Sequence, residues 1–244
     1  MSASESRDSW AKPIHRLRVE AAPPAAINMN VDGRHLVGPL QGFGQLWQKT
    51  YRVRLSGVTT TPQEVMQVWK ARFADFQPSG NRFYPGMSGI KPGEVLLIDA
   101  TLPAVPGLPG VIPVSTGVLV MFADDVSFTV ATPEGHPESG WNTFSVFEQD
   151  GAVVAQVQSL GRANDPVYEF GLRFMGGSRM QEQTWQHVLG ALARHFGVDA
   201  PVRTVKTCLD AKLQWSQFGN IRHNAGIRTF VSAPLRFGRR LLRR

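Results

Sequence analysis

The stretch that decides the fold is SRMQEQTWQHVLGALARHFG, residues 178–197. Its apolar positions recur at the spacing of one helix face. Ser178 and Gln181 have the spacing of a capping box, and Gly197 is a typical helix stop. At about 1.5 Å per residue the helix would span roughly 27 Å, enough to cross a whole sheet. Its predicted inner face consists of Gln181, Trp185, Val188, Leu189, Leu192 and Phe196.

Strand-like segments precede this helix and follow one another with short connections. Connections of this length join antiparallel neighbours, because a parallel pair needs a crossover of about a dozen residues. Two further strand candidates lie upstream. The predicted strands cover residues 50–57, 94–100, 115–122, 126–133, 141–149 and 152–160.

A second helix is predicted after the first strand. Thr61 and Glu64 form a capping box, with Pro62 at the first helical position. The apolar stripe of this helix runs to Phe76. Arg72 has the spacing of the stripe and is either an edge residue whose charged end reaches water or a buried guanidinium that would need an anion. A third helix begins after Asp165, and the Pro- and Gly-rich residues 77–93 are expected to form a loop containing Tyr84.

The order of elements predicts an α+β protein with its helices on one face of an antiparallel sheet. Along the strands, inward candidates alternate aromatic with small side chains, which favours a hollow interior between sheet and helix. The pairs that show this alternation are Phe128 with Val130, Phe144 with Val146, and Val153 with Ala155.

This arrangement resembles the START-like or helix-grip superfamily, in which a curved antiparallel sheet wraps around a long C-terminal helix. The superfamily includes birch-pollen-allergen relatives and polyketide cyclases. More narrowly, TPEGHPESGWNTFSVFEQDG (132–151) is similar to a bacterial and plant family of unknown function with a Gly-His-Pro-Glu-x-Gly hairpin. Trp141, Gly161 and Arg162 depart from that family's pattern. The matching positions are Gly135, His136, Pro137, Glu138, Gly140, Phe144, Ser159 and Gln181.

The resemblance implies a helix-grip domain with an apolar ligand cavity and no assigned reaction. The expected organisation is an N-terminal extension (1–49), a ligand-binding domain (50–197) and a basic C-terminal extension (198–244). The first expectation for function is binding of a small hydrophobic or amphipathic, lipid-like molecule without a cofactor. The predicted ligand contacts are Trp69, Phe73, Phe128, His136, Phe144, Met180, Trp185 and Leu189.

The hairpin TPEGHPESGW (132–141) raises an alternative function. His136 could stabilise the turn, contact a ligand, or transfer protons, since an imidazole titrates near neutral pH. A cyclase- or isomerase-like enzyme would place it at the cavity mouth with Arg72 or Tyr84. No metal site is expected, because no other histidine stands in metal-ligand spacing with His136. Serine-hydrolase, P-loop and dinucleotide-binding motifs do not occur in the sequence.

Composition excludes several other classes. The 244 residues are 42% apolar and 18% charged, which is ordinary for a globular protein. No apolar run approaches the roughly 18 residues of a membrane span, and the start of the chain has no apolar signal segment. We therefore expect a soluble cytoplasmic protein. Cys208 is the only cysteine, which excludes an internal disulfide and a zinc site built from cysteines.

The positive charge of the chain belongs to its C-terminal end. Of 26 Lys and Arg residues, eight lie in residues 211–244, which contain no Asp or Glu. The remainder is nearly neutral, so a nucleic-acid-binding face on the domain is not indicated. An Arg-rich segment with apolar residues suits an anionic membrane surface; a solvated or self-docked tail, or contact with nucleic-acid phosphates, is the alternative. The predicted membrane or anion contacts are Arg236, Arg239, Arg240, Arg243 and Arg244.

Overall fold

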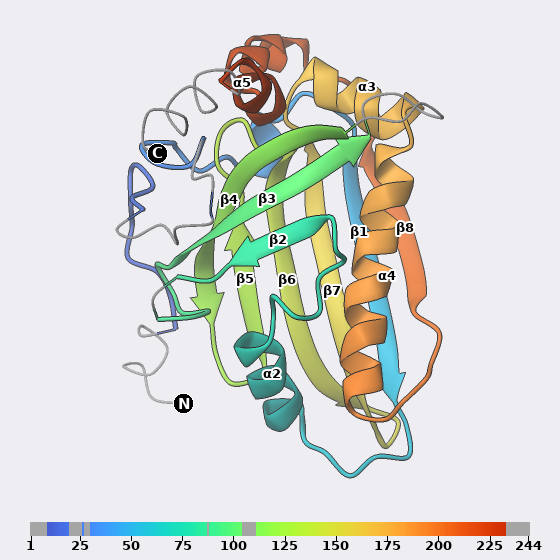
Figure 1. The fold of residues 1–244 in the computed structure, drawn as a ribbon. Coiled ribbons are helices and arrows are strands. Elements are labelled where there is room, and N and C mark those ends of the chain that lie inside the picture. Colours follow the sequence, from blue (N-terminus) through green and yellow to red (C-terminus); the bar gives the residue numbers. More distant parts are fainter. Residues whose placement is uncertain (1–8, 20–25, 27–29, 87, 104–110, 233–244) are drawn as a thin grey trace, which may run out of the picture.

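The computed structural model describes residues 9–19, 26, 30–86, 88–103 and 111–232 (Figure 1). Eight antiparallel strands form one sheet in the order β2-β3-β4-β5-β6-β7-β1-β8. The strands are β1 (Leu46–Leu55), β2 (Asn81–Tyr84), β3 (Val95–Pro103), β4 (Val111–Ala123), β5 (Ser127–Ala131), β6 (Glu138–Gln149), β7 (Ala152–Ala163) and β8 (Arg203–Asp210). The helices are η1 (Pro39–Gln41), α2 (Pro62–Ala71), α3 (Pro166–Phe174), α4 (Gly177–His195), η2 (Trp215–His223) and α5 (Ala225–Val231).

The sheet curves around α4, and α2 lies on the same side of it (Figure 1). α4 packs on β1 and β7, while α2 packs on β6 and β7. The meander β3 to β7 follows the chain order, and β1 completes it by pairing with β7. The predicted α+β class, with a curved antiparallel sheet wrapped around a long helix, is confirmed.

Helix starts agree with the sequence in two cases and differ in one. Thr61 and Glu64 form the expected capping box, and Asp165 caps α3. The predicted box of Ser178 and Gln181 is wrong, because the N-cap of α4 is Gly176, two residues earlier, with φ 79° and no side-chain cap. A left-handed glycine just after a helix is a common helix stop, here of α3, and α4 begins directly behind it; this leaves the Gln181 side chain available for other contacts.

Two apolar clusters lie on opposite faces of the sheet. The larger lies between the sheet, α2 and α4 and contains Trp69, Phe144 and Leu189. The smaller lies on the outer face, where Leu17 and Val31 of the N-terminal segment cover β3 and β4. Side chains point to alternate faces along a strand, so successive residues of β3 and β4 belong alternately to the larger and to the smaller cluster. The N-terminal segment is therefore packed against the sheet.

Residues beyond α4 also join the fold. β8 pairs with β1, and the buried Arg162 of β7 forms an ion pair at 3.1 Å with the partly exposed Asp210 at the end of β8. α5 packs on β4, and its cap residue Asn224 donates to Asp165 Oδ2 at 2.8 Å. The boundary at residue 197 stays a prediction, but part of the predicted extension contributes a strand and a helix to this structure.

The Pro- and Gly-rich segment after α2 is more ordered than the sequence predicted. Residues 81–84 form the edge strand β2 instead of a loop, because they pair with β3. α2 ends at Ala71, and turns follow it, although Phe73 and Phe76 stay buried. Arg72 ends the helix and its side chain is exposed, which agrees with an edge residue and not with a buried guanidinium.

Candidate functional site

A row of polar side chains crosses the inner face of the sheet. Lys49 of β1 lies opposite Ser159 of β7, which lies opposite Asn142 of β6. Directly opposed residues of antiparallel strands share a face. The next row toward α2 is apolar except for one hydroxyl and contains Tyr51, Val157, Phe144 and Phe128. All three polar residues are buried, so the interior is polar at one end and aromatic in the middle.

Hydrogen bonds link this polar row to α4. Lys49 Nζ donates to Gln181 Oε1 at 2.5 Å, and Gln181 Nε2 donates to Glu138 Oε2 at 2.5 Å. The amide thus lies between an ammonium and a carboxylate, and its two ends match their charges. Gln181 can take this place because it does not cap the helix. The chain of bonds fixes the N-terminal part of α4 to β1 and β6.

A pocket of about 220 Å³ opens beside these residues. Gly161, on the inner face of β7, helps to line it and leaves room that a larger side chain would fill. The pocket combines charged groups with apolar surface from Trp47 and Leu172. Its remaining lining residues are Gln45, Lys49, Glu138, Ser159, Arg162, Ala163, Glu169, Arg173 and Ser178.

Buried polar atoms without hydrogen-bond partners lie both in this polar row and beyond it, between the sheet and α4. Within the part of the chain that the structure describes, Tyr51 Oη, Trp185 Nε1 and Asn142 Oδ1 have none. Burial, with the negative charges of Glu182 and Glu138, raises the pKa of Tyr51. An unpaired polar atom in a protein interior costs about 1–3 kcal/mol, so such a group calls for a partner from outside the chain.

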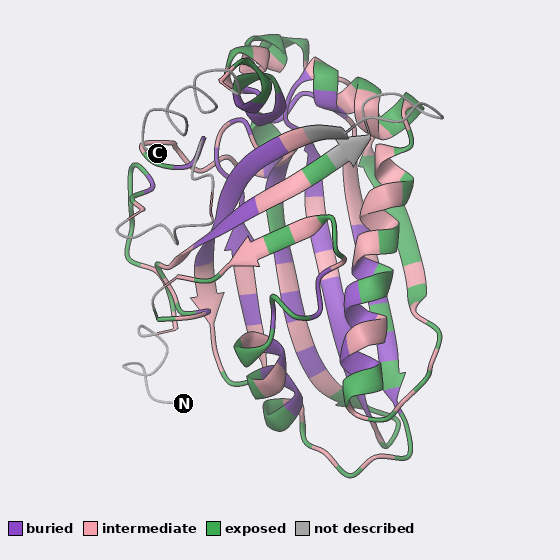
Figure 2. Cartoon of the chain, in the orientation of Figure 1, coloured by how far each residue is buried: buried purple, intermediate pink, exposed green. Residues whose placement is uncertain are grey.

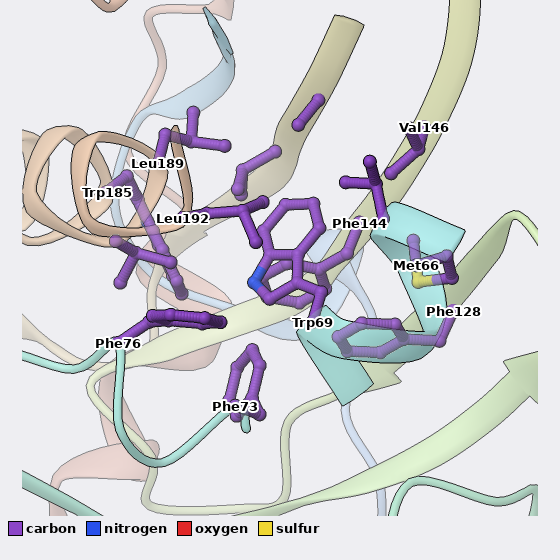
Figure 3. Packing of buried hydrophobic residues seen from close by; sticks show 14 of the residues in the cluster. Met66, Trp69, Phe73, Phe76, Phe128, Phe144, Val146, Trp185, Leu189 and Leu192 are labelled. Carbon is purple, nitrogen blue, oxygen red and sulfur yellow. The ribbon is translucent and has the colours of Figure 1, made fainter. Parts of the chain in front are cut away.

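The predicted ligand contacts lie mainly in the large apolar cluster (Figure 3). Trp69 of α2 lies among side chains of α4 and the sheet, and its ring centroid is 5.5 Å from that of Phe144. Phe128 and Phe144 stack at 4.4 Å, and Phe73 meets both edge to face. Neither the pocket of about 220 Å³ nor a second pocket of about 200 Å³ is lined by residues of this cluster. These rings pack against one another in the middle of the interior.

The positions of the other predicted contacts differ. Trp185 and Leu189 of α4 are buried in the cluster, and Phe144 contacts the Trp185 ring at 5.5 Å. Met180 is half-buried at the first turns of α4. Trp185 stands one helical turn from Gln181 and therefore lies where the polar end of the interior meets the aromatic cluster.

His136 closes its own hairpin. Its Nδ1 accepts a hydrogen bond from the backbone N–H of Glu138 at 3.1 Å. Gly135 precedes it in a left-handed conformation, φ 82°, where a side chain would collide with the His223 carbonyl. Desolvation lowers the pKa of His136 to about 4. A ring that stays neutral and holds the backbone of its own turn has a structural part in the hairpin.

The three weak catalytic candidates do not meet. Arg72 is near the C-terminal end of α4, where its Nη1 lies 3.1 Å from His195 Nδ1 and its Nε bonds Asp75 at 2.9 Å. His136 adjoins Glu138, the partner of Gln181 near the other end of α4. Fourteen residues of helix separate the two ends by roughly 20 Å. Tyr84 packs against the outer cluster, on the opposite face of the sheet.

A second pocket, of about 200 Å³, lies between the hairpin of residues 132–141 and η2. Its lining is mostly polar and includes Glu134, Asn164, Asn220 and His223. It offers little surface to an apolar molecule, so the pocket beside Lys49 is the better candidate.

Some predicted features fall outside these sites. The five tail arginines Arg236, Arg239, Arg240, Arg243 and Arg244 lie outside the described residues. Across the described ranges, no three His, Cys, Asp or Glu side chains gather in a way that could hold a metal ion. No described helix combines the length and apolar character needed to cross a membrane.

Comparison with known families adds the identification. The model of a family described as a domain of unknown function (DUF1990) matches residues 50–191, more than half of the chain. The chain belongs to the DUF1990 family. The match spans most of the predicted ligand-binding domain and includes every residue of the hairpin together with Glu138 and Gln181, while Lys49 lies one residue before it. No curated protein matches.

Solved structures of distant proteins also align with this DUF1990 chain. A START superfamily protein from Mycobacterium smegmatis is 14% identical, with a TM-score of 0.42, and the alignment covers 63% of this chain and 98% of that one. Ginseng major latex-like protein 151 from Panax ginseng is 10% identical, with a TM-score of 0.37, and the corresponding coverages are 63% and 99%.

Sequence reasoning missed most of the polar site. Glu138 and Ser159 were noted only as family-matching positions, and Gln181 as such a position and as a helix-cap and inner-face residue, while Lys49 and Tyr51 were given no functional role. One signal was available: Lys49 precedes the alternating strand at the spacing that puts it on the same face as Tyr51 and Val53. A lysine in register with buried positions indicates a charged group facing inward.

Proposed function

We propose that this protein binds a small amphipathic molecule between the sheet and α4, with the polar end of the ligand beside Lys49 and its apolar part toward Trp185 and Phe144. The single observation that carries the proposal is that the buried Tyr51 hydroxyl, one row deeper than Lys49, and the buried Trp185 indole N–H of α4 have no hydrogen-bond partner among the described residues. Structural polar networks are normally satisfied within the chain.

The chemistry of the site favours a ligand that accepts hydrogen bonds. Lys49 Nζ, Tyr51 Oη and Trp185 Nε1 are all donors. A carboxylate or carbonyl group could take bonds from them, while the aromatic rings behind them exclude water. The volume of about 220 Å³ is below the roughly 300–1,000 Å³ of typical ligand pockets. The ligand is therefore small, or only its polar end occupies this pocket. A ligand of this size is smaller than a long lipid, whose chain would have no path through the packed aromatic cluster.

Octanoate is a suitable probe, because it carries two acceptor oxygens on a short apolar chain. We expect it to bind the protein in isothermal titration calorimetry, and Lys49→Met to weaken it about tenfold to hundredfold, as loss of a hydrogen bond to a charged group would. Native mass spectrometry of the purified protein would reveal a natural ligand that remains bound.

The matched control is Lys206→Met. Like Lys49, Lys206 donates to a side chain of α4: its Nζ lies 2.7 Å from Oε1 of Glu182, the residue after Gln181. Unlike Lys49, Lys206 is exposed, on β8. We expect this variant to bind octanoate as the wild type does. Equal weakening by both lysine variants, or absence of both octanoate binding and any co-purified molecule, would refute the proposed site.

The variant Tyr51→Phe tests whether the Tyr51 hydroxyl binds the ligand or stabilises the fold. Removing an unpaired buried hydroxyl should raise the free energy of unfolding without ligand by about 1 kcal/mol, while octanoate affinity falls several-fold. Urea unfolding followed by circular dichroism measures the first quantity and calorimetry the second. Tyr168→Phe is the control of opposite sign, because Tyr168 Oη accepts a bond from Gly226 N–H at 2.9 Å and its loss should destabilise the protein. A loss of stability in Tyr51→Phe would contradict the assignment.

A further inference from the structure

α3 and α5 lie at the same end of the molecule (Figure 1), and both contain exposed residues (Figure 2). Together with η2, which precedes α5 in the chain, they carry eight exposed apolar residues. α3 presents Phe170 and Phe174 at 56% and 63% exposure, and Phe230 of α5 is 66% exposed. Large exposed apolar side chains grouped in this way mark interaction surfaces in soluble proteins. We call this group the terminal face; its members are Val167, Phe170, Phe174, Trp215, Phe218, Ile227, Phe230 and Val231.

The terminal face is held firmly by the fold. The caps of α3 and α5 are joined where Asn224 donates to Asp165, and Tyr168 accepts from the backbone of Gly226. The buried Phe43 contacts the Trp215 ring edge to face at 5.3 Å. The helices therefore have a defined inner side, and the exposed apolar residues belong to the opposite, outward side.

Charge indicates what this face binds. Residues 211–244 contain eight basic residues and no acidic one. Among the described residues of this end, Arg222 lies on η2 and Arg228 on α5, and the guanidinium of Arg173 lies 5.4 Å from the centre of the Phe174 ring. The partner therefore has to offer an apolar region to the aromatic and aliphatic side chains and negative charge to the basic residues.

We propose that the terminal face docks on the surface of an anionic lipid bilayer. Exposed aromatic and aliphatic side chains enter the boundary between headgroups and acyl chains, while basic residues are attracted by anionic lipids. A nucleic acid would use the arginines but would leave Val167, Ile227 and Val231 without a function. A second copy of this chain would cover the apolar residues but would bring two segments of like charge together.

Docking would place the proposed ligand site near the membrane. Leu172 and Arg173 of α3 line the pocket beside Lys49, and Phe170 and Phe174 lie on the same helix. An amphipathic ligand could then pass between the bilayer and the pocket over a short path. The docking inference itself does not depend on the ligand proposal, because it concerns different side chains and is measured without ligand.

The test is co-sedimentation of the full chain with vesicles. We expect the protein to sediment with vesicles of equimolar phosphatidylcholine and phosphatidylglycerol, and much less with phosphatidylcholine alone. The double variant Phe170→Gln, Phe174→Gln should lower the partition coefficient about tenfold, because two partly buried phenyl groups are lost from the interface. Glutamine is a good helix former, so α3 should persist.

The control is Val205→Gln, which replaces a residue of β8 with 55% exposure, similar to that of Phe170. It should leave sedimentation unchanged, and circular dichroism should show that all variants are folded. The inference is overturned if the wild type does not bind the anionic vesicles, or if the double variant binds them as well as the wild type. It is also overturned if the protein binds an oligonucleotide but no vesicles, or if light scattering shows a dimer that the double variant abolishes.

Discussion

Replacing Trp69 by alanine is expected to lower the free energy of unfolding by about 3–5 kcal/mol, the range for truncation of a large buried aromatic residue. Trp69 is the largest fully buried side chain and joins α2 to the sheet and to α4. Its ring meets both Phe128 and Phe144 nearly at right angles, so the substitution removes two aromatic contacts and leaves a void that rigid neighbours cannot close. Urea unfolding followed by circular dichroism measures the loss.

Trp215→Ala is the control, because Trp215 of η2 is 68% exposed. We expect this variant to lose less than about 1 kcal/mol, since much of its ring already contacts water. A loss for Trp69→Ala as small as that for Trp215→Ala would mean that the cluster around α2 is loosely packed. The interior would then have room for an apolar ligand among the aromatic rings, in the place where the sequence predicted it.

The fold was largely predictable because its signals are local. Alternation along residues 141–149 and 152–160, with a two-residue connection, predicts a hairpin, and the structure contains β6 and β7 at these places. Thr61 and Asp165 mark helix starts that the structure confirms. The edge strands were missed because β2 and β8 carry little periodicity of their own, and their pairing with β3 and β1 defines them.

The candidate site was less predictable because it depends on long-range register. Lys49 reaches Gln181 across 132 positions of sequence, and Gln181 reaches Glu138 across 43. The Gln181 side chain was assigned to a cap because its spacing from Ser178 is correct, but the N-cap of α4 is Gly176 and no side chain caps it. The expected hollow interior rested on alternating large and small residues; Phe128 and Phe144 stack on each other in this region, and the apolar cavity stays a prediction.

Acid is expected to destabilise the protein through His136, and His136→Asn to reduce that effect. The pKa of His136 is about 4 in the folded protein, because the ring is desolvated, against 6.5 for an ordinary histidine. Between these values the unfolded chain binds more protons than the folded one, so stability is fully present above pH 6.5 and is lost as the pH falls toward 4. At about 1.4 kcal/mol per pH unit over the interval between the two values, the loss amounts to about 3 kcal/mol at pH 4.

Asparagine offers an amide oxygen to the Glu138 N–H in place of Nδ1, but it does not titrate. Urea unfolding at several pH values between 7 and 4 should therefore give a shallower loss of stability for His136→Asn than for the wild type. Other groups contribute, since burial raises the pKa of Asp165 and of Glu169 and lowers that of His223. Comparing wild type with His136→Asn cancels the effects of these groups.

His187→Asn, at an exposed position of α4, is the control. Parallel pH profiles for wild type and His136→Asn would show that the ring accepts a proton without unfolding, and would return His136 to the candidates for acid–base chemistry.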